Sequence, residues 1–497
     1  MNNAGPRATR KHLSLLVSMA ALAMSGAASS AHAAADLSRL ESLLSATPEG
    51  GWVKASIGTF SDSWATDSTA VPLSSYRNPG SIVSAWSSFA WDSTRGDLLL
   101  WGGGHANYAG NEMYVWDGET GNWNRGSLAS RLDANNFVVD SAAPQSSHTY
   151  DNNLYLPVNG LFLTLGGAAF QSGAEFKTFD GTTVSASGPW LWDPSKADPN
   201  KVGGTTGSGW DPSSVGGEMW INRIAQTTGN APGSFVNAAT AYRTENGKDV
   251  VYVSTDKNAS GFPSLYRYTL GDVKNGGLDT WEKIGEMFNS ATYAGTGTID
   301  TKNNLFIRTT MITGQYTSNL AVWDLSKSNP ANPSANLDIG IRLVDELGNP
   351  FLMTPEFAVE YDSATGQLLL WDGSQQGTVW TVTPTYDANG KLLPTWVVKK
   401  LISTSFTQPG GDFSTGVFGK LHYIDELDAF MALNEFSPIT GDAEVWLYKP
   451  FSNTTTTPPN TGGGTGVGTV DEPNAAALLL ASLGILGLAR RRREARN

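Results

Sequence analysis

The sequence predicts an all-β protein whose short strands form a closed ring of four-stranded sheets. Three observations lead to this prediction. The chain combines 55 glycines with 17 tryptophans, which suits many short strands joined by tight turns. Long amphipathic helical patterns are nearly absent. One four-strand pattern recurs along the chain, most clearly in Leu98–Trp123, where apolar runs are bounded by Gly and Asp-Gly.

Each repeat starts with an innermost strand that ends in an aromatic residue or Ile followed by a charged turn residue. Apolar second and third strands and a fourth strand with a Trp follow it. The six predicted innermost strands are 89–92, 148–151, 240–243, 297–300, 359–362 and 422–425. The second strands begin at Leu98, Phe162, Val250, Leu305, Leu368 and Phe430, and the third at Met113, Pro189, Leu265, Leu320, Val379 and Glu444. The fourth strands carry Trp123, Trp220, Trp281 and Trp396, with the Trp-less Ala335–Ile339 in the fourth repeat.

The last repeat lacks a fourth strand after Lys449, because a segment with few apolar residues begins there. Gly51–Lys54 matches the missing strand, so we expect it to complete the last sheet. Closure of this kind leaves only short, protected sheet edges. The sequence therefore predicts a six-bladed β-propeller over residues 34–451, closed by an N-terminal strand. A seventh blade would have to lie in Ser195–Gly217, where we expect an extended loop because no complete four-strand unit fits.

Paired glycines follow the second strands of the first two repeats, at Gly102-Gly103 and Gly166-Gly167, and third strands often end in Trp-Asp. With the Trp of the fourth strand, these residues resemble kelch repeats, as in the central domain of galactose-oxidase-like proteins. The match is good in the first two repeats and degenerate later. The oxidase chemistry is not implied, since it uses a Tyr–Cys crosslink on copper and this chain has no cysteine.

Residues 1–33 have the layout of a secretory signal peptide. Arg7, Arg10 and Lys11 precede the apolar stretch Leu13–Leu22, and Ala31-His32-Ala33 supplies small residues for signal peptidase. We therefore expect export and removal of this segment.

The other end has three parts. Residues 452–470 are rich in Thr, Gly and Pro and predict a flexible linker. Residues 471–497 contain an apolar stretch over 475–489, which is short for a membrane span. This stretch lies between Asp471, Glu472 and Pro473 on one side and Arg490, Arg491, Arg492 and Arg493 on the other.

This tail resembles the PEP-CTERM sorting signal of Gram-negative envelope proteins, with Asp471 in place of the first proline. The resemblance implies an exosortase-type transpeptidase as a partner and a membrane-inserted helix before processing. It also implies a final place in the cell envelope, at the cell surface or in extracellular matrix. A plain membrane anchor is the alternative.

The charge and the absence of cysteine exclude several classes of function. The net charge is −13 although both ends are basic, so the predicted propeller is acidic. Phosphate binding needs clustered Lys and Arg, which argues against nucleic acid as the main partner. Without cysteine the chain has no disulfide framework, no Cys-ligated metal and no thiol nucleophile.

Three histidines remain after signal removal: His105, His148 and His422. The repeat alignment places them in three neighbouring blades, so we expect them to converge on one face near the channel mouth. Together they would suit a divalent metal or general acid–base catalysis, and a His with a Tyr would suit β-elimination on an acidic sugar. The alternative is that each histidine is a structural hydrogen-bonding residue. Candidate supporting contacts in the loop of His105 are Asn107, Tyr108, Asn111 and Glu112.

The sequence favours a binding protein over an enzyme. Gly-x-Ser-x-Gly, His-Glu-x-x-His, phosphate-loop and sialidase-type motifs do not occur in it. We expect an exported propeller that binds polysaccharide or another protein. The alternative is an extracellular hydrolase or lyase that acts on a polymer through the histidines. Candidate sugar-stacking aromatic residues in predicted loops are Tyr76, Trp86, Tyr108, Trp210 and Tyr316.

Overall fold

The computed structural model describes residues 35–71, 78–170, 188–209, 211, 213–256, 263–291, 293–373, 377–410, 415–434 and 443–452, with the backbone of 176–177 and 183–184. The predicted signal peptide, the linker from residue 453 onward, and the sorting residues all lie outside these residues, as do Tyr76 and Trp210. In the described part, no helix has the length and apolar character needed to cross a membrane.

This part of the chain is built almost entirely of strands and turns. Its helices are α1 (Ser38–Ala46) and the four-residue α2 (Ser81–Ser84). Single 3₁₀ turns occur at Phe60–Ser63, Pro194–Lys196, Leu325–Lys327, Pro333–Ala335 and Asp425–Leu427.

Most strands pair antiparallel with strands that are close to them in the sequence. The first sheet comprises β2 (Phe89–Asp92), β3 (Asp97–Leu100), β4 (Tyr114–Asp117) and β5 (Trp123–Arg125). The next comprises β7 (Asn153–Leu156), β8 (Leu161–Thr164), β12 (Trp190–Trp192) and β15 (Trp220–Asn222). The third comprises β17 (Ala239–Glu245), β18 (Lys248–Ser254), β19 (Ser264–Thr269) and β20 (Asp279–Glu286), with β16 (Thr227–Gly229) parallel to β20.

Two further four-strand arrays are joined edge to edge. They are β21 (Gly297–Asp300), β22 (Leu305–Thr309), β23 (Leu320–Asp324) and β24 (Ile339–Val344), and then β25 (Ala358–Asp362), β26 (Gln367–Trp371), β27 (Val379–Val382) and β28 (Thr395–Leu401). Their outer strands β24 and β28 pair in parallel. The last array is β29 (Leu421–Ile424), β30 (Ala429–Leu433), β31 (Val445–Lys449) and β1 (Gly51–Lys54).

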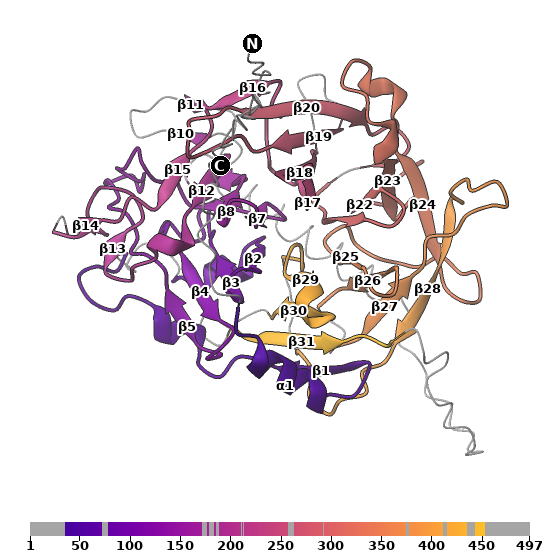
Figure 1. Ribbon diagram of the computed structural model, residues 1–497, viewed down its shortest axis with the longest axis horizontal. Helices are drawn as coiled ribbons and strands as arrows, with labels where there is room; N and C mark the ends of the chain where they lie inside the picture. The colour runs from indigo at the N-terminus through magenta and orange to yellow at the C-terminus, as the bar shows by residue number, and fades with distance from the viewer. Residues whose placement is uncertain are drawn as a thin grey trace, which may run out of the picture. The chain divides into compact units, whose positions relative to one another are not determined.

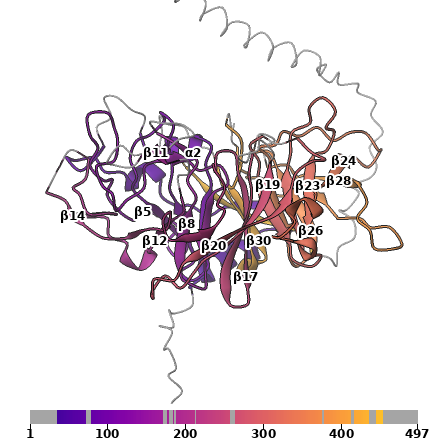
Figure 2. The same cartoon turned by 90° about the horizontal axis from the view of Figure 1, so that it is seen from above.

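The arrays lie around a common axis in a propeller-like arrangement, with the first strand of each array innermost (Figure 1). Successive innermost strands contact one another, from β2 to β7, β17, β21, β25 and β29. In the view turned by 90°, the strands of these sheets are seen from the side (Figure 2).

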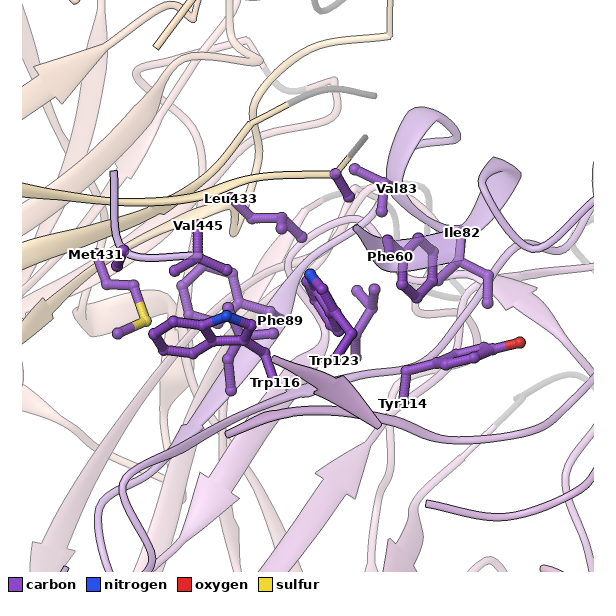
Figure 3. Close-up of a cluster of buried hydrophobic side chains, with 14 of the residues drawn as sticks. Phe60, Ile82, Val83, Phe89, Tyr114, Trp116, Trp123, Met431, Leu433 and Val445 are labelled. Carbon is purple, nitrogen blue, oxygen red and sulfur yellow. The ribbon is translucent and has the colours of Figure 1, made fainter. Parts of the chain in front are cut away.

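The predicted closure by the N-terminal strand is confirmed. β1 pairs antiparallel with β31, with Gly51 opposite Lys449 and Lys54 opposite Trp446. On one side of this seam, Trp52 packs against the neighbouring array through Trp371, with 5.5 Å between ring centroids. On the other side, Met431, Leu433 and Val445 pack with residues of the first sheet and the segment before it (Figure 3).

Hydrophobic clusters fill the spaces between successive arrays because second strands such as β8, β22 and β30 bury both of their faces. In β3, Leu98 and Leu100 join the cluster shared with β30 and β31, whereas Leu99 joins the cluster shared with the β7–β15 sheet. Alternate side chains of a strand point to opposite faces, so a run such as Leu98–Leu100 serves two interfaces. This explains why the second strands are continuously apolar.

The innermost strand of the second sheet differs from the prediction. It is β7 (Asn153–Leu156), not residues 148–151. His148 instead lies in β6 (Ser147–His148), which pairs with β9 (Ala168–Ala169) in a separate two-stranded sheet. Asn152 directly precedes β7, and its side chain holds the start of the strand in place by donating to the carbonyls of Gly166 and Phe235.

Two other boundaries differ in a similar way. The fourth strand of the fourth repeat is β24 (Ile339–Val344), which begins where the predicted strand ends. The last innermost strand ends at Ile424, so the register predicted for His422 was wrong by one residue. In Ser195–Gly217, the described residues form the short parallel pair β13 (Lys201–Val202) and β14 (Val215–Gly216), in keeping with the expected loop.

Remaining two-residue strands are β10 (Phe176–Lys177) and β11 (Thr183–Val184), which pair with each other.

Candidate functional site

A cavity of about 510 Å³ lies among the innermost strands, and we call it the channel cavity. Five aromatic side chains line it, one from each of five innermost strands, and Ile299 of β21 lines it from the sixth. We call these aromatic residues the aromatic collar: Trp91, Tyr155, Tyr242, Tyr361 and Tyr423.

Hydrogen bonds to the neighbouring turns hold the collar tyrosines in place. The hydroxyl of Tyr155 donates to Thr94 Oγ1 (2.7 Å), that of Tyr242 to Asp249 Oδ1 (2.8 Å) and that of Tyr423 to Asp428 Oδ1 (2.6 Å). Burial raises the pKa of all four collar tyrosines, that of Tyr361 to about 12. The collar therefore presents neutral rings of fixed orientation.

Asp151 lines the cavity just before β7 and is only 4% exposed. Its Oδ2 accepts hydrogen bonds from the backbone N–H groups of Thr240 (2.7 Å) and Gly297 (2.9 Å), which belong to β17 and β21. The Thr240 hydroxyl donates to the Asp151 carbonyl. Burial raises the pKa of the Asp151 carboxyl to about 8, so the carboxyl is mainly neutral at pH 7.

His422 and Glu360 form an ion pair in the cavity wall. His422 Nδ1 lies 2.7 Å from Glu360 Oε1, and Nε2 lies 3.1 Å from the Phe89 carbonyl oxygen. A carboxylate and a carbonyl can only accept, so both ring nitrogens donate and the imidazole is charged. Burial opposes this charge, but Glu360 outweighs it and raises the pKa of His422. The Thr298 hydroxyl donates to Glu360 Oε2 (3.1 Å).

The lining of the channel cavity is acidic. It contains the carboxyl groups of Asp151, Glu360, Asp425 and Glu426, and His422 is its one basic residue among the described ones. The charge of His422 is matched by that of Glu360. Asp425 and Glu426 are exposed near the cavity mouth and leave it with a net negative charge.

The structure brings two of the three predicted histidines together. The ring centroids of His105 and His148 are 5.6 Å apart, and His148 also lies 4.8 Å from Trp86 and 6.1 Å from Tyr150. His422 has different neighbours, in the wall of the channel cavity. In the described part of the chain, no three His, Asp or Glu side chains are grouped so that they could hold a metal ion.

The surroundings of His148 favour a structural role. It is 2% exposed, and its Nε2 lies 2.9 Å from Asn107 Oδ1, which can only accept. Burial, together with the neighbouring His105, lowers the pKa of His148 to about 3, so its imidazole is neutral.

The other predicted supporting residues stabilise their own loop. The Tyr108 hydroxyl donates to Glu112 Oε1 (2.5 Å), and the Tyr114 hydroxyl donates to the same oxygen (2.8 Å). Asn111 accepts from the backbone N–H of Ser130 (2.7 Å). Tyr108, Asn111 and Glu112 are all buried. Of the four predicted supporting residues, Asn107 is therefore the one bonded to a predicted histidine.

The cluster around His148 has an unusual backbone. Trp86, His105, Tyr150 and Phe418 all have φ between 40° and 51°, a region that bulky side chains rarely adopt. The rings of Tyr150 and Phe418 lie 5.8 Å apart. We call these four residues and His148 the imidazole–aromatic cluster. Tyr150 directly precedes Asp151, so the cluster and the channel cavity meet at consecutive residues.

No family model and no curated protein matches the sequence. Two solved structures are distant matches at 12% identity. A candidate 6-phosphogluconolactonase from Bacteroides uniformis aligns over 77% of this chain and 86% of its own, with a TM-score of 0.32. The extracellular domain of a candidate one-component system from B. thetaiotaomicron aligns over 72% of this chain and 42% of its own, with a TM-score of 0.23. Both likenesses are too distant to assign a function.

The geometry thus distinguishes two places where the sequence predicted one. The channel cavity offers volume, aromatic faces and acidic groups to a ligand. The imidazole–aromatic cluster is packed and hydrogen-bonded within itself. Sequence reasoning used the aromatic residues at strand ends as repeat markers, but it did not identify Asp151, Glu360 or the collar as a site.

Proposed function

We propose that this chain is an exported, six-bladed, kelch-like β-propeller that binds a saccharide in the channel cavity. The observation that carries the proposal is the aromatic collar, which lines the same cavity as the polar side chains of Asp151, Glu360 and His422. Aromatic faces stack on the apolar faces of sugar rings, and fixed hydrogen-bonding groups select their hydroxyls. The cavity volume of about 510 Å³ falls in the range of about 300–1,000 Å³ typical of small-ligand sites.

The cellular setting of the proposal rests on the two ends of the sequence. The signal peptide would send the chain out of the cytoplasm. The PEP-CTERM-like tail would bring it to an exosortase-type enzyme and then to the envelope, the cell surface or the extracellular matrix. A saccharide-binding propeller suits such a place, because polysaccharides are abundant there. The kelch-like repeats account for the Gly and Trp positions of the first two sheets.

The histidine-based enzyme is the weaker candidate. His148 is buried and bonded to Asn107, and His422 is paired with Glu360, so neither is arranged as a free base. A hydrolase or lyase that uses all three histidines would need them in one group, and the described structure separates His422 from the other two.

Binding to the collar can be tested by calorimetry on the mature protein with panels of oligosaccharides. Trp91→Ala and Tyr242→Ala should each weaken binding at least tenfold, because each removes one stacking face. Tyr386→Ala is the matched control, since Tyr386 is exposed and does not line the cavity. Equal affinities in the collar variants and the control, with unchanged circular dichroism, would reject the channel cavity as the binding site.

A further inference from the structure

We propose that the saccharide bound in the channel cavity is cationic and carries a free ammonium group that is held beside Asp151 and Glu360. This inference rests on the proposed function and names the ligand class. An aminated sugar without N-acetylation has the required chemistry.

The charge of the lining is the first argument. Four carboxyl groups line the cavity, whereas no Lys or Arg does so among the described residues. His422 adds no net attraction for an anion, because Glu360 lies 2.7 Å from it. A uronic acid, sulfate or phosphate group would be desolvated next to like charge, which disfavours such ligands. An ammonium group would instead meet complementary charge.

The collar is the second argument. Cations are attracted to the faces of Trp and Tyr rings, and the attraction is strongest where water is excluded. The hydroxyls of Tyr242 and Tyr423 donate to carboxyl groups, so these rings act as hydrogen-bond donors at their edges and keep electron-rich faces. The same rings can stack on the apolar face of the sugar that carries the amine.

The third argument is that Asp151 and Glu360 have hydrogen-bond acceptors to spare. Both backbone hydrogen bonds to the Asp151 carboxyl go to Oδ2. In the described structure no hydrogen bond reaches Asp151 Oδ1, although the residue is 4% exposed and lines the cavity. Each Glu360 oxygen accepts one hydrogen bond and keeps a second lone pair for a donor. An ammonium group has three donors and can satisfy these acceptors together. Asp151 is mainly neutral without the ligand, and a cation bound beside it lowers the pKa of its carboxyl, so the carboxyl ionises and pairs with the ammonium group.

The test compares three trisaccharides by calorimetry on the mature protein: a glucosamine trimer with free amines, the N-acetylglucosamine trimer and a galacturonic acid trimer. The glucosamine trimer should bind at least tenfold more tightly than the acetylated trimer, and the galacturonic acid trimer should not bind measurably. The preference should shrink as ionic strength rises.

Variants then locate the charge. Asp151→Asn keeps an oxygen for the two backbone donors and should reduce the preference for the amine at least fivefold. Glu426→Gln, at the exposed mouth, should reduce it about two- to threefold without disturbing a buried group. Glu346→Gln makes the same charge change on an exposed turn outside the cavity and should have no effect.

The possible outcomes separate the two proposals. Equal affinity for the glucosamine and acetylated trimers, or tighter binding of the galacturonic acid trimer, overturns the cationic ligand and leaves a saccharide site in place. A preference for the amine that persists unchanged in both Asp151→Asn and Glu426→Gln overturns the assigned position. Binding of none of the three, nor of any oligosaccharide in the panel, overturns the proposed function itself.

Discussion

At the scale of single residues, the Asp151 side chain connects three of the sheets around the channel. It ties the start of the second sheet to β17 and β21 through one carboxyl oxygen. Its neighbour Tyr150 packs into the imidazole–aromatic cluster. The consecutive residues Tyr150 and Asp151 therefore link the imidazole–aromatic cluster to the lining of the channel cavity.

Replacing Asp151 by Asn or Ala should have different effects on stability. Asp151→Asn retains an acceptor for the N–H groups of Thr240 and Gly297, whereas Asp151→Ala leaves both buried donors unpaired. Each unpaired donor costs about 1–3 kcal/mol, so the alanine variant should lose about 2–6 kcal/mol in free energy of unfolding. Urea titration at pH 7 measures this, and equal losses in the two variants would show that the hydrogen bonds contribute little.

Asp151 should also make stability depend on pH. Its pKa is about 8 in the folded protein and about 4 in the unfolded chain. The folded state therefore holds the proton longer, and the stabilisation by this group is complete below about pH 4 and is lost as the pH rises to about 8. Relative to wild type, Asp151→Asn should gain stability between pH 5 and pH 8. A constant difference across this range would contradict the raised pKa.

The His422–Glu360 pair, like Asp151, should stabilise the protein more at low pH than at high pH. The pKa of His422 is raised in the folded protein, so its contribution is present below the unfolded pKa of about 6.5 and is lost as the pH rises through the folded pKa. Glu360→Gln should lower the pKa of His422, as seen in the NMR titration of its imidazole, and should destabilise the protein more at pH 6 than at pH 9. Thr298→Val, which removes a hydroxyl bonded to Glu360, is the milder control.

At the scale of elements, the decisive strand is β1, because it joins residues near the beginning of the described chain to its last sheet. Trp52 is its anchor: it is 1% exposed, its Nε1 donates to the Gly377 carbonyl (2.7 Å), and its ring lies 5.0 Å from that of Tyr448. Lys54 on the same strand is bonded to Glu444 but is largely exposed.

Truncating the anchor should therefore weaken the closure far more than truncating its exposed neighbour. Trp52→Ala should cost about 3–5 kcal/mol, as for a large buried aromatic residue. Lys54→Ala should cost less than about 1 kcal/mol, as for an exposed ion pair. Calorimetric melting of the two variants provides the comparison, and similar melting temperatures would mean that β1 is not needed for closure.

At the scale of the whole molecule, the fold consists of small sheets that have little core of their own and share hydrophobic clusters with both neighbours. The ring brings the innermost strands to one axis, and the described lining of the channel cavity comes from several sheets. Binding is therefore expected to require the closed ring, not an individual repeat.

The ends of the chain give one prediction at this scale, from sequence alone. In a host with an exosortase-type system, mass spectrometry of the secreted protein should show a new N-terminus at Ala34 and loss of the tail. Asp471→Pro restores the family motif and should increase the processed fraction. Retention of the whole tail in both forms would favour a plain membrane anchor.

The sequence by itself determined the all-β repeat and the closing strand. Glycine and Asp-Gly turns and apolar second strands are short-range signals that can be recognised without knowledge of the packing. The match of Gly51–Lys54 to the missing strand extends the same repeat pattern to the other end of the described chain. The structure confirms the pairing of β1 with β31.

Only the tertiary structure decided which residues face the channel. Residues 148–151 carry the pattern of an innermost strand, whereas 153–156 lack the charged residue after their tyrosine, yet the innermost strand in the structure is 153–156. Side chains alternate between the faces of a strand, so a slip of one residue sends a side chain to the opposite face. For this reason the sequence placed His148 and His422 together, whereas the fold groups His422 with Glu360 and Asp151, residues contributed by three different sheets.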